Sequence, residues 1–205
     1  MGNVTTGNSA AGTVNAATMK PGEIPPTNCQ ELKTSNENLR TTLSEDSSKS
    51  VSDNFGKSGA TTVAHGSLNG GAPIGAGSRL LPSRYDKRVV EGLWAEKDKT
   101  KRRKKIEDGS SNLCPKPEFK YAKGYRPHQS HCESKILETL FSGEPKPKGT
   151  LLLNINWQNS EHNNSKEPCE ACEELLCHAQ KECGLQILLC DDVPYHAPKP
   201  LTTCG

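Results

Sequence analysis

The last third of the chain alternates helical and strand patterns, and this alternation constrains the fold more than any other feature. "HCESKILETL" has apolar residues at helical spacing, and "GTLLLNINW" reads as a buried strand. "PCEACEELLCHAQKECG" is then a helix that stops at Gly184, and "LQILLCDD" is a second buried strand. Helix, strand, helix and strand in this order predict an α/β fold.

The first 78 residues have a different character. They are mostly Gly, Ser, Thr, Asn and Ala with scattered charges, as in "TTGNSAAGTVNAAT" and "GSLNGGAPIGAG". Such segments bury too little apolar surface to offset the entropy lost on ordering them. The whole chain is 32% hydrophobic and 4% aromatic, which is low for a fully folded protein. We therefore predict that residues 1–78 are a disordered, low-complexity leader or linker and that residues 79–205 form one domain.

The nine cysteines are unevenly distributed. Cys29 stands alone near the front, whereas six others crowd into the last third of the chain. A disulfide scaffold is usually shorter, with its cysteines spread through loops. Because several of these cysteines fall inside helix-like or strand-like patterns, we expect reduced thiols and metal ligation.

Two short motifs place metal-binding chemistry at the starts of the two predicted helices. His131 and Glu133 form a His-x-Glu pair, and Cys169 and Cys172 form Pro-Cys-x-x-Cys. A helix N-terminus stabilises thiolates. One His and two Cys are three ligands for Zn²⁺ and leave a fourth position for water, as in catalytic sites. Glu133 could take a proton from that water and pass it to a leaving nitrogen.

The combination of these motifs, with one strand between them, is the signature of zinc deaminases. Residues from about 115 to 192 resemble the cytidine deaminase superfamily, and "HCESKILETL", "GTLLLNIN" and "PCEACEELL" most resemble the deaminase toxin domains of bacterial polymorphic toxins. The resemblance implies a three-layer α/β/α fold with a mixed sheet. By motif position it implies that His131, Cys169 and Cys172 bind zinc and that Glu133 shuttles protons. It also implies cytosine in DNA or RNA as the substrate and an immunity protein as a partner.

The end of the chain departs from that superfamily, whose members commonly have another helix and strand after the fourth strand. Here only "VPYHAPKPLTTCG" follows the last predicted strand. Either the domain is a minimal version, or Tyr195 and His196 belong to a short terminal segment that closes the pocket.

Aromatic and histidine residues near the motifs are candidates for substrate binding. Trp157 and His162 flank the loop before Pro168 and could stack on a base. Tyr125 and His128 precede the first motif. Packing at a strand end is the plainer interpretation of Trp157.

The run "KDKTKRRKK", residues 97–105, has seven basic residues and one acidic residue. It could contact nucleic-acid phosphates, and a solvated helix face is an equal alternative. The candidate phosphate contacts are Lys101, Arg102, Arg103, Lys104 and Lys105. Against a polyanion stand the acidic residues near the second motif, which would repel phosphates unless they face away: Glu161, Glu167, Glu170, Glu173 and Glu174.

The sequence thus predicts zinc-dependent hydrolytic deamination of cytosine to uracil in nucleic acid, with DNA favoured over RNA, by a toxin effector. One alternative keeps the chemistry but acts on free nucleosides or nucleotides, or on adenine. Another is a non-catalytic module in which two of Cys177, His178 and Cys183 join Cys169 and Cys172 in a structural zinc site. Otherwise Cys132, Cys177, Cys183 and Cys190 are expected to be packing residues, and His178 to face solvent.

The chain has no stretch near the roughly 20 apolar residues of a membrane span, and its N-terminus lacks the blocks of a secretory signal. We expect secretion as a toxin by a non-classical route, followed by activity in the cytoplasm of a target cell.

Overall fold

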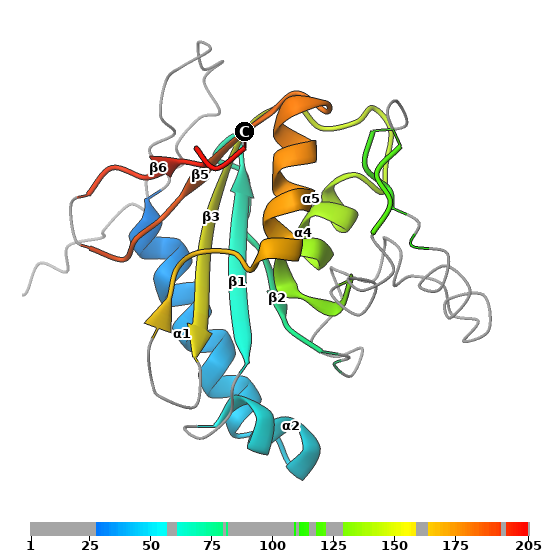
Figure 1. Ribbon diagram of the computed structural model, residues 1–205. Helices are drawn as coiled ribbons and strands as arrows, with labels where there is room; N and C mark the ends of the chain where they lie inside the picture. The colour runs from blue at the N-terminus through cyan, green and yellow to red at the C-terminus, as the bar shows by residue number, and fades with distance from the viewer. Residues whose placement is uncertain are drawn as a thin grey trace, which may run out of the picture.

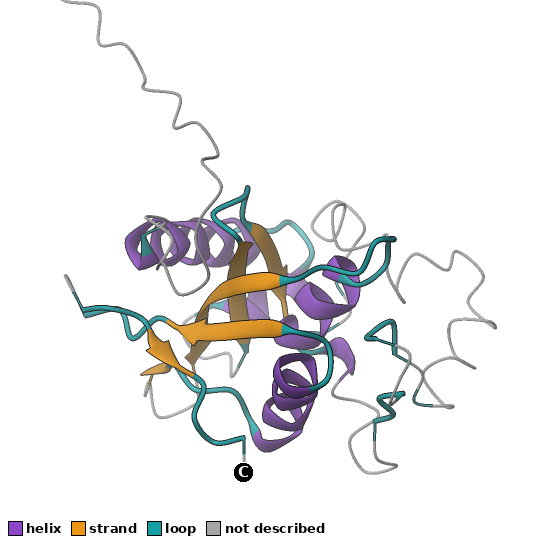
Figure 2. Ribbon diagram, turned by 90° about the horizontal axis from the view of Figure 1, so that it is seen from above, coloured by secondary structure: helices purple, strands orange, loops and turns teal. Residues whose placement is uncertain are grey.

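The computed structural model describes residues 28–56, 61–79, 81, 109, 111–114, 118–121, 129–158, 164–193 and 196–204. These residues form three layers, with a sheet between two sets of helices (Figures 1 and 2). Helices α1 (Cys29–Ser44) and α2 (Lys49–Phe55) lie on one face, and α4 (Cys132–Leu140) and α5 (Glu170–Lys181) lie on the other. The predicted three-layer α/β/α fold is confirmed.

The sheet is mixed, as predicted, with strand order β2-β1-β3-β5-β6. β2 (Ile74–Gly77) and β1 (Thr62–Leu68) form an antiparallel hairpin, and β1 also runs antiparallel to β3 (Gly149–Gln158). β3 is parallel to β5 (Leu185–Leu189), so the chain must cross between them through α5. The short strands β6 (Lys199–Pro200) and β4 (Asn164–Ser165) pair antiparallel with β5 and β3.

Strand β3 lies at the centre of the sheet and is covered on both faces, which explains its nearly continuous apolar sequence. Successive side chains of a strand point to opposite faces. Leu151, Leu153 and Ile155 therefore belong to the main core beneath α4 and α5. Leu152 points the other way and packs with Leu32 of α1.

The prediction that residues 1–78 lie outside the domain is wrong for residues 28–56 and 61–78, which form α1, α2, β1 and β2. The misleading feature is the face of α1 toward the sheet, where polar residues replace part of the apolar period. Asn36 Nδ2 donates hydrogen bonds to the Asn154 carbonyl (3.0 Å) and Oδ1 (2.6 Å). Arg40 Nη2 donates to the Asn156 carbonyl (2.7 Å) and Oδ1 (2.8 Å). Residues 1–27 lie outside the described residues.

Small residues in β1 and β2 are a second reason why this region resembles a disordered segment in sequence. In the structure they allow neighbouring elements to pack closely. A Cβ atom at Gly66 would lie 3.2 Å from side-chain carbons of both Ile136 and Leu151. The glycine thus allows α4 and β3 to approach β1. A segment poor in large apolar residues is here part of a tightly packed sheet.

Six of the nine cysteines form disulfide bonds, so the expectation of reduced thiols is wrong for them. The bonds join α1 to the end of β5, the segment before α4 to the end of α5, and α5 to the C-terminal residues: Cys29–Cys190, Cys114–Cys183 and Cys177–Cys204. Each bond joins residues that are far apart in sequence, which helical or strand patterns cannot reveal. The free cysteines are Cys132, Cys169 and Cys172. Cys132 is buried in the main core, as predicted.

Candidate metal centre

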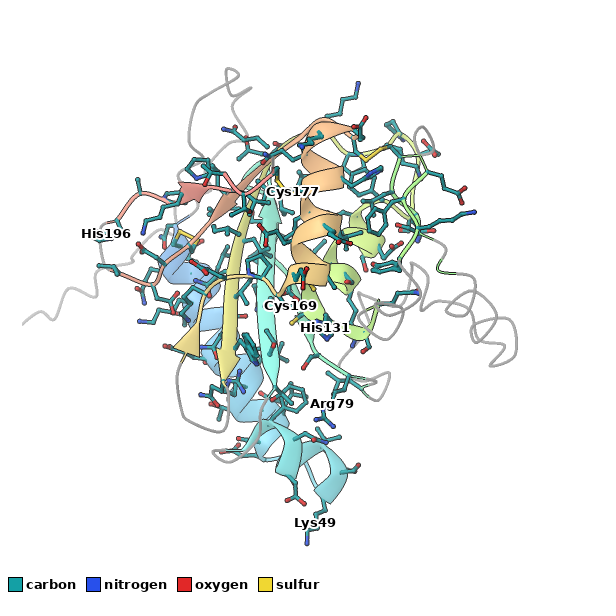
Figure 3. All side chains as sticks on the ribbon, viewed as in Figure 1. Lys49, Arg79, His131, Cys169, Cys177 and His196 are labelled. Carbon is teal, nitrogen blue, oxygen red and sulfur yellow. A yellow bond between two sulfur atoms is a disulfide. The ribbon has the colours of Figure 1, made fainter. Side chains whose placement is uncertain are left out.

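Three side chains meet where α4 and α5 begin, on one face of the sheet (Figure 3). His131 Nδ1 lies 3.5 Å from Cys169 Sγ and 3.4 Å from Cys172 Sγ. The three ligand atoms all lie within 4.8 Å of one another, so this group could hold a metal ion. The structure therefore brings together the three residues that the two motifs singled out.

The local backbone explains how these side chains converge. His131 is the N-cap residue of α4 and Cys169 is the N-cap residue of α5, and both have extended backbone conformations. An N-cap is usually Ser, Thr, Asp or Asn, whose side chain accepts a hydrogen bond from the first turn. Neither His131 nor Cys169 makes such a side-chain bond. Their side chains instead turn toward each other across the gap between the helices.

Hydrogen bonds within this group set its protonation. The bond from Cys172 is the main reason that the pKa of Cys169 falls to about 4, and a further bond from His131 adds to it. The same bond, together with burial, raises the pKa of Cys172 well above its ordinary value. The pKa of His131 is raised, chiefly by its hydrogen bond to Cys169. A metal ion would replace the shared protons, because thiolates and neutral imidazole are the ligating forms.

Glu133 lies in the first turn of α4 and is 4% exposed. Its Oε2 atom is buried and has no hydrogen-bond partner among the described residues. Burial raises the pKa of this carboxyl group above its ordinary value. An unsatisfied buried oxygen costs stability, and in a native protein such a group calls for a functional explanation.

A cavity of about 270 Å³ opens beside these residues. It is lined by side chains from β1, the end of β2, α4, β3 and the start of α5: Thr62, Ser78, Arg79, Ser130, His131, Glu133, Trp157, Glu167 and Cys169. Trp157 is 38% exposed and lines this cavity. It is one of the residues that the sequence suggested could stack on a base. Of the acidic residues near the second motif, Glu167 lines this cavity.

The other candidates for substrate binding fall outside the described residues. These are His162, Tyr125 and His128, with the basic residues Lys101, Arg102, Arg103, Lys104 and Lys105. Glu161 and Tyr195 fall outside them as well.

Thr62, Ser78 and Arg79 also line the cavity. The sequence patterns do not reveal them, because Thr62 and Ser78 lie in the expected leader and Arg79 is part of no motif. One signal could have found them. Asn69 and Gly70 have positive φ angles of 51° and 72° and form the turn between β1 and β2. Asn-Gly between two short strand-like segments is the strongest local sign of a β-hairpin.

The end of the chain does not close the metal centre through His196. This residue is exposed, its Nδ1 lies 3.1 Å from Asp191 Oδ2, and it lines a different cavity. The alternative that His196 closes the pocket is therefore wrong. The short strand β6 extends the sheet beyond β5 instead.

A second group that could hold a metal ion consists of Cys114, His178 and Cys183. The two sulfur atoms are bonded to each other, so they can ligate as thiolates only after reduction. His178 is half-buried and packs against Phe119, with ring centroids 5.2 Å apart, so the prediction that it faces solvent is wrong.

The predicted structural zinc site would add two of Cys177, His178 and Cys183 to Cys169 and Cys172. Cys177 is bonded to Cys204, and His178 and Cys183 belong to the separate group. That set of four ligands is therefore wrong. Within the described ranges, the group at the helix starts consists of one histidine and two cysteines.

Comparisons with known proteins find no match to a family model, a curated protein or a solved structure. In the part of the chain that the structure describes, no helix has both the length and the apolar character needed to cross a membrane. The function proposed next rests on the residues and geometry of the metal centre.

Proposed function

We propose that this protein is a zinc-dependent deaminase that converts cytosine to uracil in nucleic acid. The observation that carries the proposal is the meeting of His131, Cys169 and Cys172 beside the buried, unpartnered carboxylate oxygen of Glu133. All except the buried Cys172 line one cavity. The three-layer α/β/α fold with a mixed sheet is the fold that the resemblance to the cytidine deaminase superfamily implies.

The donor atoms fit a zinc ion. Tetrahedral Zn–S distances of about 2.3 Å and Zn–N distances of about 2.0–2.1 Å place bound nitrogen and sulfur atoms about 3.6 Å apart. The two N···S distances are 3.5 and 3.4 Å. Two thiolates would balance the charge of Zn²⁺, and three protein ligands leave one position for water. When bound, zinc would supply a water molecule whose pKa is lowered toward about 7.

Glu133 would hold and move the protons of the reaction. Its carboxylate would take one proton from the attacking water and deliver it to the ring nitrogen of cytosine. It would then take the second proton from the added hydroxyl group and deliver it to the amino group, which leaves as ammonia while the C=O bond of uracil forms. The cavity of about 270 Å³ is near the lower end of small-molecule pockets, about 300 Å³, which suits a single base. Trp157 in its wall would stack on that base. The base must be unstacked or single-stranded to enter.

The test is a deamination assay on cytosine-containing single-stranded and duplex DNA and RNA and on free cytidine. We expect wild type to form uracil with one zinc per chain. Glu133→Gln should keep its zinc and its fold while the rate falls about a hundredfold to ten-thousandfold, the range typical of a lost general acid–base. His131→Ala should lose zinc and activity together. Glu174→Gln, at an exposed position of α5, is the matched control and should leave both unchanged.

A zinc-loaded, folded wild type that forms no product from any of these substrates would contradict the proposal. So would full activity in Glu133→Gln. Product from free cytidine alone would keep the chemistry and favour a deaminase of small substrates. Secretion, a toxin role and an immunity partner stay predictions of the sequence resemblance.

A further inference from the structure

A second cavity of about 540 Å³ adjoins the candidate metal centre, and Arg79 and Ser130 line both cavities. The rest of its lining comes from α2, the residue before it and Leu81: Ser48, Ser50, Val51, Asn54, Phe55 and Leu81. Figure 3 shows Arg79 between His131 and α2. A ligand in the metal-centre cavity could therefore continue into the second cavity past Arg79.

The second cavity combines an apolar base with a polar rim. Val51 and Phe55 are 5% and 1% exposed and belong to a buried cluster, against which Leu81 packs. Hydroxyl groups of Ser48 and Ser50 and the amide of Asn54 complete the lining. A nucleobase has the matching chemistry, because its flat face is apolar and its edges form hydrogen bonds.

Arg79 is the one lysine or arginine among the described residues that line either cavity, and its side chain is exposed. Apart from the candidate metal ligands, the other ionisable side chains that line the metal-centre cavity are carboxylic acids, Glu133 and Glu167. The wall shared by the two cavities is thus the place where a phosphate group would find a cation. A guanidinium is well suited to this, since it binds phosphate through two parallel hydrogen bonds.

Hydrogen bonds with α4 and with the residues just before it hold the backbone at Arg79 in place. Its φ angle of +71° is rare for a residue other than glycine. The amide of Arg79 donates to the Ser130 carbonyl (3.0 Å), and Lys135 Nζ donates to the carbonyls of Gly77 (2.8 Å) and Arg79 (2.6 Å). Lys135 is 1% exposed and follows Glu133 by two residues on α4. A strained conformation that several bonds enforce is typical of functional positions.

From the shared wall, the lining of the second cavity and the enforced placement of Arg79, we infer that the substrate is a nucleic acid strand. The second cavity takes the nucleotide next to the target cytosine, and Arg79 binds the phosphate that joins the two. This inference rests on the proposed function and narrows it, since a free nucleoside has neither that phosphate nor that neighbour.

The test measures binding separately from turnover. A fluorescein-labelled single strand of four nucleotides with one cytosine is titrated with zinc-loaded Glu133→Gln protein at several salt concentrations, and fluorescence anisotropy is read. Arg79→Asn is the informative substitution, because Asn removes the charge and tolerates a positive φ angle. It should weaken binding about tenfold and reduce the slope of log K against log salt by about one, as expected for one lost phosphate contact. Arg79→Lys keeps the charge and should therefore retain part of the affinity and part of the salt dependence.

Lys49→Ala is the matched control for the charge. Lys49 is exposed on α2, beside Ser48 and Ser50, and lines neither cavity (Figure 3). Loss of the Lys49 charge should leave the affinity for the oligonucleotide and the slope of log K against log salt unchanged.

Ser50→Trp tests the second cavity itself. The larger side chain should fill this cavity and weaken the binding of a dinucleotide, while the binding of cytidine monophosphate stays unchanged. Thermal unfolding of each variant checks that the fold is kept.

The inference would be overturned if Arg79→Asn and Lys49→Ala had the same affinity for the oligonucleotide and the same slope of log K against log salt. It would also be overturned if Ser50→Trp weakened the binding of mononucleotide and dinucleotide equally. Absence of oligonucleotide binding would overturn it whatever the deamination assay gives. The proposed function fails by a different result, namely no uracil from zinc-loaded wild type. Uracil from cytidine and oligonucleotide alike, with Arg79→Asn as active as wild type on both, would keep the proposed function and reject the inference.

Discussion

Two regions pack against the same central strand by different interactions. On one face of β3, Leu151, Leu153 and Ile155 meet apolar residues of α4 and α5 in the main core. On the other face, Asn154 and Asn156 form hydrogen bonds with Asn36 and Arg40 of α1. Among the described residues, the apolar contacts on that second face form two small clusters that involve α1 and α2.

A helix that packs on a sheet can therefore lack part of the apolar period by which helices are recognised. Asn36 Oδ1 lies 2.7 Å from His65 Nδ1, and burial lowers the pKa of His65 to about 4, so the ring is neutral there. Asn154 in turn donates to Asp192, which pairs with Lys166. This chain of polar groups links α1 to β1, β3 and the residues after β5. Its members satisfy one another, which is the condition for burying polar groups at low cost.

The largest effect is expected from deleting residues 1–78. The remaining chain should not fold, because β1 pairs with β3 over seven residues, from Thr62 opposite Trp157 to Leu68 opposite Leu151. The deletion also removes α1 and so uncovers one face of β3. Circular dichroism and urea unfolding would show whether the fragment 79–205 has a cooperative transition.

The matched control for the deletion is a chain of residues 28–205, which keeps every described helix and strand. It should unfold at nearly the same urea concentration as the full chain. A cooperative transition in the fragment 79–205 would mean that the polar region is dispensable, and the comparison of the two regions would lose its basis.

A smaller loss is expected from Leu153→Ala in the apolar region. The substitution leaves a cavity in the main core and should lower the free energy of unfolding by about 2–5 kcal/mol. Leu152→Ala is the matched control, since both side chains are 1% exposed and they are neighbours on β3. Leu152 belongs to a cluster of four buried residues beneath α1, so its loss should cost less. Urea unfolding of both variants measures the difference, and an equal loss would contradict it.

The contrast between the apolar and the polar face of β3 also explains which parts of the fold could be predicted from the sequence. The sequence predicts four of the elements: the helix beginning at Cys132, the strand from Gly149, the helix ending at Lys181 and the strand from Leu185. The two helices have an apolar face at helical spacing, and the two strands are short, nearly continuous apolar segments. Residues 28–56 and 61–78 were not expected to be part of the fold, because hydrogen bonds and small residues replace that period there. The three disulfide bonds were missed because they span 161, 69 and 27 residues, and spacing alone does not specify such pairs.

The candidate site could be predicted in part. His131, Cys169 and Cys172 do meet, because each motif lies at a helix start and the long strand between them, β3, forms the core under both helices. That these residues bind zinc and that Glu133 moves protons stay predictions. Part of the cavity wall comes from β1, through Thr62, and from the segment after β2, through Ser78 and Arg79. Those positions depend on tertiary structure that the sequence patterns did not reveal.

Asn36→Leu tests the polar region directly and should cost less than Leu153→Ala. Leucine has a similar volume, and in an apolar interface it would be neutral or stabilising. Here it removes the hydrogen bonds to Asn154 and His65 and leaves buried groups unsatisfied. We expect a loss of about 1–3 kcal/mol in the free energy of unfolding, measured by urea denaturation.

Thr34→Leu, at an exposed position of the same helix, is the control and should change stability by about 0.5 kcal/mol or less. An Asn36→Leu protein as stable as wild type would show that shape alone holds α1 on the sheet. The two faces of β3 would then differ in amino-acid composition, but the hydrogen bonds on the polar face would contribute nothing measurable to stability.

The smallest effect concerns Glu138, one of several buried polar residues of α4 on the apolar side. Its carboxylate accepts hydrogen bonds from Ser111 Oγ and the Asn112 amide, both at 2.6 Å, and from the Tyr121 hydroxyl at 3.4 Å. It thereby ties Ser111, Asn112 and Tyr121 to α4. Burial outweighs these bonds and raises the pKa of Glu138 to about 7 from an ordinary 4.5. The folded protein therefore holds this proton more tightly than the unfolded chain does.

Stability should accordingly be full below pH 4.5 and decline as the pH rises through about 7. Between pH 6 and 8 the free energy of unfolding should fall by about 1 kcal/mol from this group, since one pKa unit corresponds to about 1.4 kcal/mol. Glu138→Gln does not titrate, so urea unfolding at several pH values should give a flatter profile for this variant over the same window. Parallel profiles for the two proteins would mean that the three hydrogen bonds keep Glu138 ionised, and that on its apolar side the fold satisfies this buried charge as it satisfies Asn36 and Asn154 on the polar side.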